Sequence, residues 1–333
     1  MSIDVLSSSR PALPPRASWR DYLQMARLDH MTKHVFILPG LVLAWVLRNP
    51  PLDDLLPSLL LGFASAVLIA SANYIINEWL DREFDAFHPD KSKRPAVNVS
   101  MTPLPVYASY TACVAVGLLL AWQLGPVFFV TSVLFWLSGV VYNVKPLRSK
   151  DKAYLDVLSE SLNNPIRLML GWGMVEHTTV APASLLLAYW MGGAFLMGAK
   201  RLSEYREIAA GPGVEVLHRY RRSFQHYTEE RLTISCFTYA LLATLLIGVF
   251  MVKYRIEFLI ACPLIIALFA QYLALSMRAG SVAQKPEKLF REKRLMALTG
   301  ATVAALMVAG LVDLPFLQSF TEPHYITVQR GAR

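Results

Sequence analysis

Long apolar stretches alternate with short polar ones along the whole chain. A membrane core of about 30 Å needs about 20 apolar residues per helical span. Nine stretches have this character, the first and last being short, and they cover residues 34–48, 57–77, 104–123, 125–142, 155–175, 181–199, 232–252, 256–276 and 296–313. With 55% hydrophobic residues and a mean hydropathy of +0.40, the pattern predicts an all-α, polytopic membrane protein built as a bundle of nine transmembrane helices.

Basic residues lie almost entirely on one side of these predicted spans. If the N-terminus is inside, 26 of the 32 Lys and Arg residues fall in inner segments and five fall outside. This bias predicts a cytoplasmic N-terminus and a multi-pass protein of the cell inner (plasma) membrane. The net charge of +8 then reflects topology and anionic headgroups, and gives no reason to expect a nucleic-acid partner.

The two ends of the chain differ from its middle. Residues 1–17 are rich in Ser, Pro and Arg, which predicts a disordered N-terminal tail. Residues 18–313 are expected to form one membrane domain. Residues 314–333 contain two prolines and are expected to form an irregular C-terminal tail.

The most informative polar segment follows the second predicted span. On a helix, Asn77, Asp81 and Asp85 lie within about 80° of one another, on one narrow face. Hard oxygen ligands in this array suit Mg²⁺, which is usually shared with substrate phosphates. The following basic residues suit phosphate oxygens. The segment therefore predicts a metal-bridged diphosphate site; the alternative is a solvated loop with internal ion pairs.

A second polar stripe lies inside the fifth predicted span. Its five members share one face of a helix that is otherwise apolar: Asp156, Glu160, Asn163, Asn164 and Arg167. A charge at membrane depth costs at least about 2.5–3.5 kcal/mol, so the stripe is expected to face an interior or aqueous cavity. The alternative is a structural Glu160–Arg167 pair. Pro165 is expected to kink this span.

A third cluster, Lys200 to Glu207, follows the sixth predicted span. Lys200 and Arg201 side by side at a helix end are natural phosphate ligands. The alternative is a solvated helix extension with a Lys200–Glu204 pair. Tyr142–Arg148 and Arg219–Tyr227 are also basic and aromatic, and for both the positive-inside pattern explains the residues at least as well as substrate contact.

These residues resemble the UbiA superfamily of intramembrane prenyltransferases. Its pattern N-D-x-x-D-x-x-x-D follows the second of nine helices and precedes a basic stretch that ends in R-P. Here Asn77, Asp81, Asp85 and Arg94-Pro95 match, and Glu78 replaces the usual Asp. The resemblance implies a UbiA-type fold, a Mg²⁺ cofactor, an isoprenoid lipid substrate, a donor that contains a diphosphate, and metal ligands at Asn77, Asp81 and Asp85 with assistance from Glu78.

Within that superfamily, the chain is most similar to the polyprenyl-phosphate phosphoribosyltransferase branch. The similarity lies in His88-Pro89-x-Lys91, in Lys33, and in Lys200-Arg201-x-x-Glu204 where typical prenyltransferases carry a second aspartate-rich motif. It implies transfer of 5-phosphoribose from phosphoribosyl pyrophosphate (PRPP) to a polyprenyl phosphate on the cytoplasmic face. The alternatives are transfer of an isoprenoid chain to an aromatic or other small acceptor and, ranked lower, transport.

The polar clusters and the resemblance together give candidate roles, although the pattern Asn163 to Arg167 in the fifth span is not one that the resemblance accounts for. Asp81, Asp85, Glu160 and Glu204 are the candidate catalytic residues, and either glutamate is expected to orient the ribose hydroxyls. The candidate substrate-binding residues are Lys33, His88, Lys91, Arg94, Asn163, Arg167, Lys200, Arg201 and Tyr205.

Overall fold

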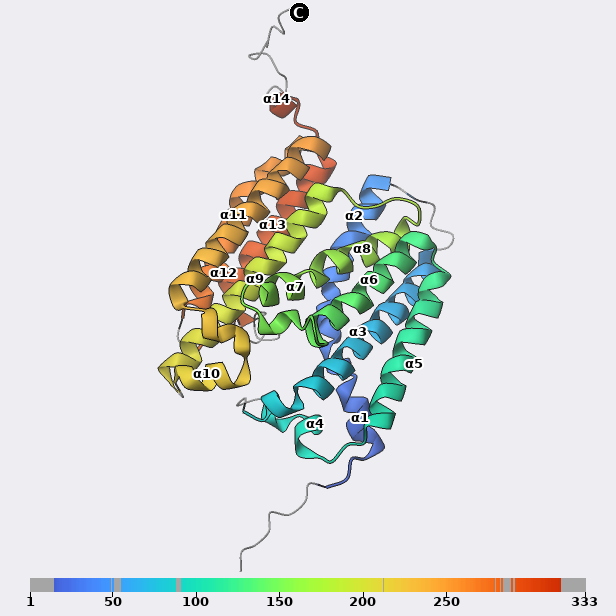
Figure 1. The fold of residues 1–333 in the computed structure, drawn as a ribbon. Helices are drawn as coiled ribbons and strands as arrows, with labels where there is room; N and C mark the ends of the chain where they lie inside the picture. The colour runs from blue at the N-terminus through green and yellow to red at the C-terminus, as the bar shows by residue number, and fades with distance from the viewer. Residues whose placement is uncertain are drawn as a thin grey trace, which may run out of the picture.

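The structure is a computed structural model of an all-helical chain (Figure 1). It describes residues 15–48, 50, 55–87, 91–211, 213–278, 280, 281, 283, 289 and 291–318; the side chains of residues 30–33 and 220 lie outside this description.

The first group of helices surrounds α3. This helix has 31 residues, so it is about 46 Å long and extends beyond a membrane core. Alongside α3 pack α5, α6 and α8. The bounds of the group are η1 Leu28–Ile37, α2 Leu38–Arg48, α3 Leu55–Asp85, α5 Pro103–Trp122, α6 Pro126–Asn143 and α8 Asn163–Val175.

Close backbone contact holds α8 against η1 and α2. A β-carbon at Gly171 would lie 2.0 Å from the carbonyl oxygen of Ile37, and one at Gly40 would lie 1.9 Å from that of Leu168. Only glycine allows the two backbones to approach this closely. The pair fixes α8 in the middle of the first group, where its whole length from Pro165 to Val175 is buried.

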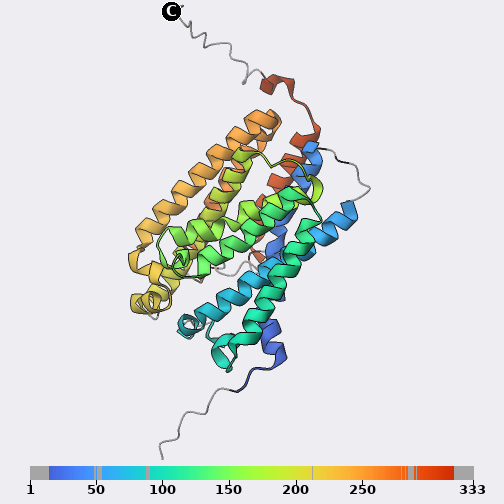
Figure 2. The same cartoon turned by 45° about the vertical axis from the view of Figure 1, so that its right-hand side comes forward.

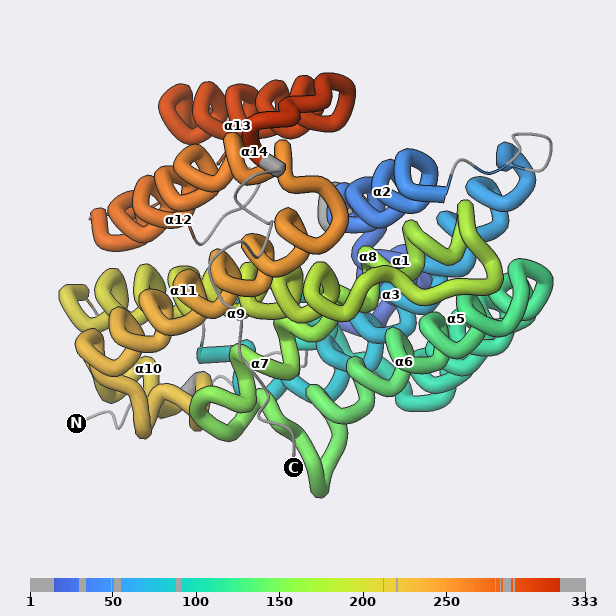
Figure 3. Tube along the Cα trace, turned by 90° about the horizontal axis from the view of Figure 1, so that it is seen from above, coloured from blue at the N-terminus to red at the C-terminus, as the bar shows by residue number. Residues whose placement is uncertain are grey.

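The second group is formed by the later part of the chain. Its long axis is α9, which packs against α11, with α12 and α13 outside them; the view from above shows this arrangement (Figure 3). Figure 2 shows α11 running beside α9 over much of its length. The bounds are α7 Leu155–Ser161, α9 Ala183–Ala210, α11 Glu229–Tyr254, η5 Ile256–Ala261, α12 Cys262–Ser276 and α13 Lys293–Leu311.

Short elements gather at one end of the bundle. In Figure 1, α1, α4 and α10 lie at the lower end, where the polar ends of α3 and α9 also lie. Pro15–Ala17 pairs with Ser100 through a parallel bridge, so this part of the predicted tail is held to the bundle. The bounds are α1 Trp19–Met25, η2 Lys91–Lys93, α4 Pro95–Asn98, η3 Ser149–Asp151, α10 Val214–Tyr220, η4 Arg222–His226 and, at the opposite end, α14 Pro315–Gln318.

The described residues contain six helices long and apolar enough to cross a membrane, together with the shorter apolar helix His34–Arg48. Helix composition therefore shows a multi-pass membrane protein. The predicted span 155–175 is divided into α7 and α8 at Leu162. The break lies just before Pro165, which has no N–H to bond the carbonyl of Ser161 and continue α7, so the expected interruption of this span is present. The predicted span 181–199 forms the first two thirds of α9.

Candidate active site

Side chains of both signs surround one cavity at the polar end of α3. The cavity has a volume of about 30 Å³, and five basic and three acidic side chains line it together with one phenylalanine: Asp81, Phe84, Asp85, Lys91, Arg148, Lys150, Asp151, Arg221 and Arg222. The excess of basic groups favours an anionic ligand. We call this the Asp81 cavity.

Asp81 is held by two cations from the segment after α6. Its Oδ1 lies 2.5 Å from Nζ of Lys150 and accepts a hydrogen bond of 2.8 Å from Nη2 of Arg148. Arg148 also donates to Asp151 at 3.0 Å. Burial lowers the pKa of Lys150 to about 8, and the nearby Asp81 opposes that shift. The lysine is therefore mostly cationic at neutral pH.

Asp85, one turn further along α3, is held by the segment that follows it. Its Oδ2 accepts a hydrogen bond of 2.5 Å from Arg94, and Lys91 lies 3.9 Å from Oδ1. Burial lowers the pKa of Lys91 to about 8, and Glu204 and Asp85 oppose the shift. Glu204 belongs to α9, so Lys91 stands between the polar ends of the two helix groups.

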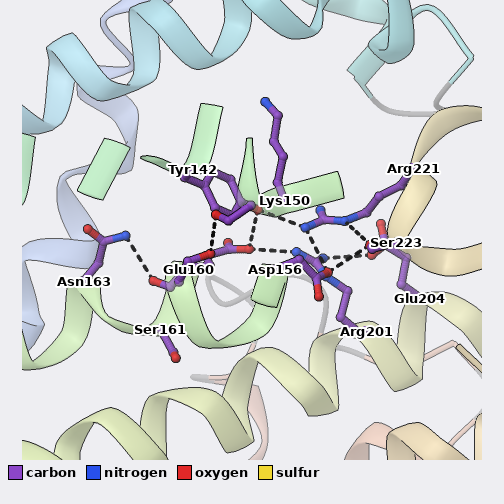
Figure 4. Close-up of polar contacts among 12 residues, drawn as sticks. Tyr142, Lys150, Asp156, Glu160, Ser161, Asn163, Arg201, Glu204, Arg221 and Ser223 are labelled. Carbon is purple, nitrogen blue, oxygen red and sulfur yellow. Dashed lines mark hydrogen bonds and ion pairs between the residues drawn. The ribbon is translucent and has the colours of Figure 1, made fainter. Parts of the chain in front are cut away.

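A guanidinium joins α7 to α9 beside the Asp81 cavity (Figure 4). Arg201 is 2% exposed and contacts three carboxylates: Glu160 at 2.7 Å, Glu204 at 3.0 Å and Asp156 at 3.4 Å. Tyr142 also donates to Glu160, at 2.8 Å. We call Arg201 and its three carboxylates the Arg201 cluster. The guanidinium of Arg201 is therefore buried and shared among three acids, and its role as a phosphate ligand stays a prediction.

Asp156 attaches the segment before α11 to this cluster. Its carboxylate is completely buried and accepts hydrogen bonds from Tyr227 at 2.6 Å, Ser223 at 3.0 Å and Arg221 at 3.2 Å. Arg221 also donates to Tyr142. Since Arg221 lines the Asp81 cavity, Asp156 fixes one of the cavity's cations.

The remaining predicted ligands occupy other places. Asn77 donates to Asn143 at 2.5 Å, and it is not among the residues that line the cavity. Glu78 is 2% exposed and accepts a weak hydrogen bond from the backbone N–H of Ala96, at the start of α4. The structure therefore brings Asp81 and Asp85 to the cavity but neither Asn77 nor Glu78.

The polar stripe of the fifth predicted span is also divided. Asn163 accepts from Ser138 and donates to the carbonyl of Glu160, so it bridges α6 to the break between α7 and α8. Arg167 lies over the ring of Phe135, 5.2 Å from its centroid. Glu160 contacts Arg201 rather than Arg167, so the alternative of a Glu160–Arg167 pair is wrong.

Three further candidates lie elsewhere or are not described. The ring of Tyr205 packs against Phe224 in an apolar cluster and is not part of the cavity lining. Lys200 lies close enough to Glu160 to act on it electrostatically. The side chain of Lys33 and the whole of His88 lie outside the described residues.

Five of the eight charged cavity residues are not among the sequence-predicted site residues, and neither is Phe84. Arg148, Arg221 and Arg222 stand in stretches that the positive-inside pattern already explained. Lys150 and Asp151 carry no signal of their own, since only the turn after α6 brings them back to Asp81. From the sequence alone, a residue can be assigned to the site of Asp81 only if it lies close to α3 along the chain, and these residues do not.

The donor set of the cavity fits Mg²⁺. Asp81 and Asp85 present hard carboxylate oxygens to one cavity, and Mg²⁺ is commonly bound by one or two carboxylates together with substrate phosphates. Within the described ranges, no group of three or more His, Cys, Asp or Glu is placed to hold an ion. A metal here would therefore take several ligands from substrate or water.

Comparison with known proteins agrees with this architecture. The sequence model of the UbiA prenyltransferase family matches residues 35–299, which is most of the chain. The chain belongs to the UbiA prenyltransferase family. It is thus a membrane transferase. A UbiA homolog from Archaeoglobus fulgidus bound to GPP and Mg²⁺ has the same fold, with a TM-score of 0.64 and 21% identity over 88% of this chain and 100% of that one.

Named relatives within the UbiA family are mixed. The protoheme IX farnesyltransferase of Alkalihalophilus pseudofirmus is 23% identical over 67% of this chain and 73% of its own length. The decaprenyl-phosphate phosphoribosyltransferase of Mycobacterium tuberculosis is 27% identical over 54% of this chain and 56% of its own length. The chain thus spans little more than half of the second relative.

Proposed function

We propose that this UbiA-family transferase uses Mg²⁺ and a donor with a diphosphate leaving group, which binds in the Asp81 cavity at the cytoplasmic end of a nine-helix bundle in the inner membrane. One observation carries the proposal: Asp81 and Asp85 line the same cavity as Lys91, Arg148, Lys150, Arg221 and Arg222. With Asp151, three carboxylates lie beside five cations, a mixture that suits a metal ion and a polyanion bound together better than either of them alone.

The favoured donor is PRPP and the favoured acceptor is a polyprenyl phosphate. In this reaction the bond between C1 of the ribose and the diphosphate oxygen breaks, and the diphosphate leaves with the electron pair. An oxygen of the lipid phosphate forms the new bond to C1. The acceptor oxygen is already anionic, so it needs positioning more than a general base. The surplus of cations in the cavity supports this choice, since PRPP carries one phosphate more than an isoprenoid diphosphate.

The chain's own residues have four tasks in this scheme. Lys150 and Arg148 exchange Asp81 for the leaving diphosphate, and Asp81 and Asp85 would hold the metal. Mg²⁺, when bound, neutralises charge on the leaving group as a Lewis acid. The side chain of Glu160 is 28% exposed and accepts a hydrogen bond from a ribose hydroxyl. The buried Asp156 keeps Arg221 directed to the cavity.

A second candidate is transfer of an isoprenoid chain from its diphosphate to an aromatic or other small acceptor. It is favoured by the farnesyltransferase name of one relative and by the Archaeoglobus homolog's bound GPP and Mg²⁺. The same cavity would bind the diphosphate, and the allylic carbon would replace C1 of ribose.

A labelled-donor assay separates the two candidates. The purified protein is incubated with Mg²⁺, labelled PRPP and a polyprenyl phosphate, and in parallel with a labelled isoprenoid diphosphate and an aromatic acid. Labelled lipid from PRPP supports the favoured reaction. Product only from the isoprenoid diphosphate supports the second candidate, and no diphosphate release from either donor contradicts the proposal as a whole.

A further inference from the structure

Arg167 is a buried cation without a matching anion in the part of the chain that the structure describes. Its residue surface is 9% exposed, and its Nε has no hydrogen-bond partner. Its contact is with the ring of Phe135, 5.2 Å from the guanidinium. Cation–π contact of this kind offsets only part of the cost of burying a guanidinium.

The carboxylate that acts on Arg167 electrostatically, that of Glu160, already has other hydrogen-bond donors. Glu160 acts on Arg167 electrostatically, but its Oε2 accepts hydrogen bonds from Tyr142 and Arg201. No ion pair joins Arg167 to any described acid. A charge that a membrane protein retains in its interior without a partner is a functional-site hypothesis by default.

A second unsatisfied group lies against the same phenylalanine. Asn73 donates its Nδ2 to the carbonyl of Phe135 at 2.8 Å, and its Oδ1 is buried without a partner. Gly139 makes room for this amide, since a β-carbon there would lie 2.0 Å from Oδ1. Arg167 of α8 and Asn73 of α3 thus both contact Phe135 of α6, Arg167 through the ring and Asn73 through the backbone carbonyl.

Arg167 and Asn73 lie at a different depth along the bundle from the Asp81 cavity, where the diphosphate is proposed to bind. Asn73 precedes Asp81 by eight residues on α3, which is about 12 Å along the helix axis. That separation is longer than a diphosphate but suits the other end of a small bound molecule. The phosphate of a phosphosugar and the carboxylate of an aromatic acid are both anions that Arg binds well.

We propose that Arg167 binds a second anionic group of the substrates, a phosphate or a carboxylate, deeper in the membrane than the donor diphosphate. This inference rests on the proposed function, because it takes the Asp81 cavity as the place of that diphosphate. Three sources share the chemistry: the 5-phosphate of the donor, the phosphate of a lipid acceptor, and the carboxylate of an aromatic acceptor.

The test compares Arg167→Met and Arg167→Lys with Arg255→Met in the full chain in detergent. Arg255 is a matched structural arginine, bonded to the carbonyl of Ala309 and to Asp313 at the other end of the bundle. Without ligand, Arg167→Met is expected to melt at or above the wild-type temperature, because it removes an unpaired buried charge, whereas Arg255→Met melts lower. A fall for Arg167→Met like that of Arg255→Met would overturn the proposal in favour of a structural role.

Ligand binding provides the second readout. The affinities for ribose 5-phosphate, farnesyl phosphate and 4-hydroxybenzoate are measured by calorimetry, beside that for pyrophosphate with Mg²⁺. Arg167→Met is expected to weaken one of the three anions by about 10- to 100-fold, with partial recovery in Arg167→Lys, while pyrophosphate is unaffected. The anion that is weakened identifies the source.

Two results contradict the inference: binding of none of the three anions by the wild type, or equal binding of all three by wild type and Arg167→Met. Failure of the wild type to bind pyrophosphate with Mg²⁺ would contradict the proposed function instead. The two failures are therefore separate.

Discussion

Nζ of Lys150 lies 2.5 Å from Oδ1 of Asp81, inside the cavity that both residues line. The two groups neutralise each other in this arrangement. If Asp81 binds a metal, it exchanges the cation of Lys150 for a metal cation. If Lys150 binds a phosphate, it exchanges the carboxylate of Asp81 for another anion. The ion pair thus keeps two buried charges satisfied until substrate and metal replace them, which avoids the cost of leaving either charge alone.

Replacement of Asp81 tests the metal assignment. Asp81→Asn is expected to lower turnover by about 10²–10³-fold, because it removes an anionic ligand and weakens stabilisation of the leaving diphosphate. Turnover and melting temperature are measured together. Glu83→Gln, on the same helix with its side chain 81% exposed, is the control and is expected to act like the wild type. Activity within a factor of three of wild type in Asp81→Asn would contradict the assignment.

The Arg201 cluster makes a prediction about stability. Arg201→Ala leaves Asp156, Glu160 and Glu204 close together without their shared cation, and the expected loss is about 3–5 kcal/mol of unfolding free energy. Arg206→Ala, on the same helix, removes a half-exposed pair with Glu229 and is expected to cost about 1 kcal/mol or less. Thermal unfolding in detergent compares the two. Equal losses would show that Arg201 is not the centre of the cluster.

Comparing variants of Tyr227 and Tyr205 distinguishes a tyrosine hydroxyl that positions a cavity residue from a tyrosine ring that only packs. Tyr227→Phe removes the 2.6 Å hydrogen bond to Asp156 and the one accepted from the N–H of Tyr154. We expect a loss of about 1–3 kcal/mol and a higher KM for the donor, because Arg221 loses its support. Tyr205→Phe is expected to change neither stability nor KM. A raised KM in Tyr205→Phe would support the sequence-based assignment of Tyr205 to substrate binding.

Gly171 tests the packing that holds α8 in place. Gly171→Ala places a methyl group 2.0 Å from the carbonyl oxygen of Ile37, and a backbone atom cannot move away as a flexible side chain could. We expect a clear fall in melting temperature. Gly248→Ala, in α11 with nothing within 4 Å, is expected to be neutral or stabilising, because alanine is the better helix former. A neutral Gly171→Ala would contradict the close approach of α8 and η1.

The sequence alone predicted the helical membrane fold and the paired aspartates, and its failures have a physical pattern. Asp81 and Asp85 could be paired because one helical period relates them. Lys150 could not, because its contact with Asp81 depends on the turn after α6. The contacts of Arg201 with Asp156 and Glu160 could not be predicted either, because these two acids lie on another helix. Hydropathy likewise predicted one span over 155–175, although the chain breaks it at Leu162.

The most direct test of the account is calorimetric binding of pyrophosphate to the full chain, with and without Mg²⁺. The wild type is expected to bind it with Mg²⁺, to lose most of this affinity on chelation by EDTA, and to recover it when Mg²⁺ is restored. The double variant Asp81→Asn, Asp85→Asn is expected to lose the Mg²⁺ dependence. Binding by the wild type that is unchanged by EDTA, or Mg²⁺-dependent binding that persists in the double variant, would contradict the claim that these two carboxylates hold the metal against the diphosphate.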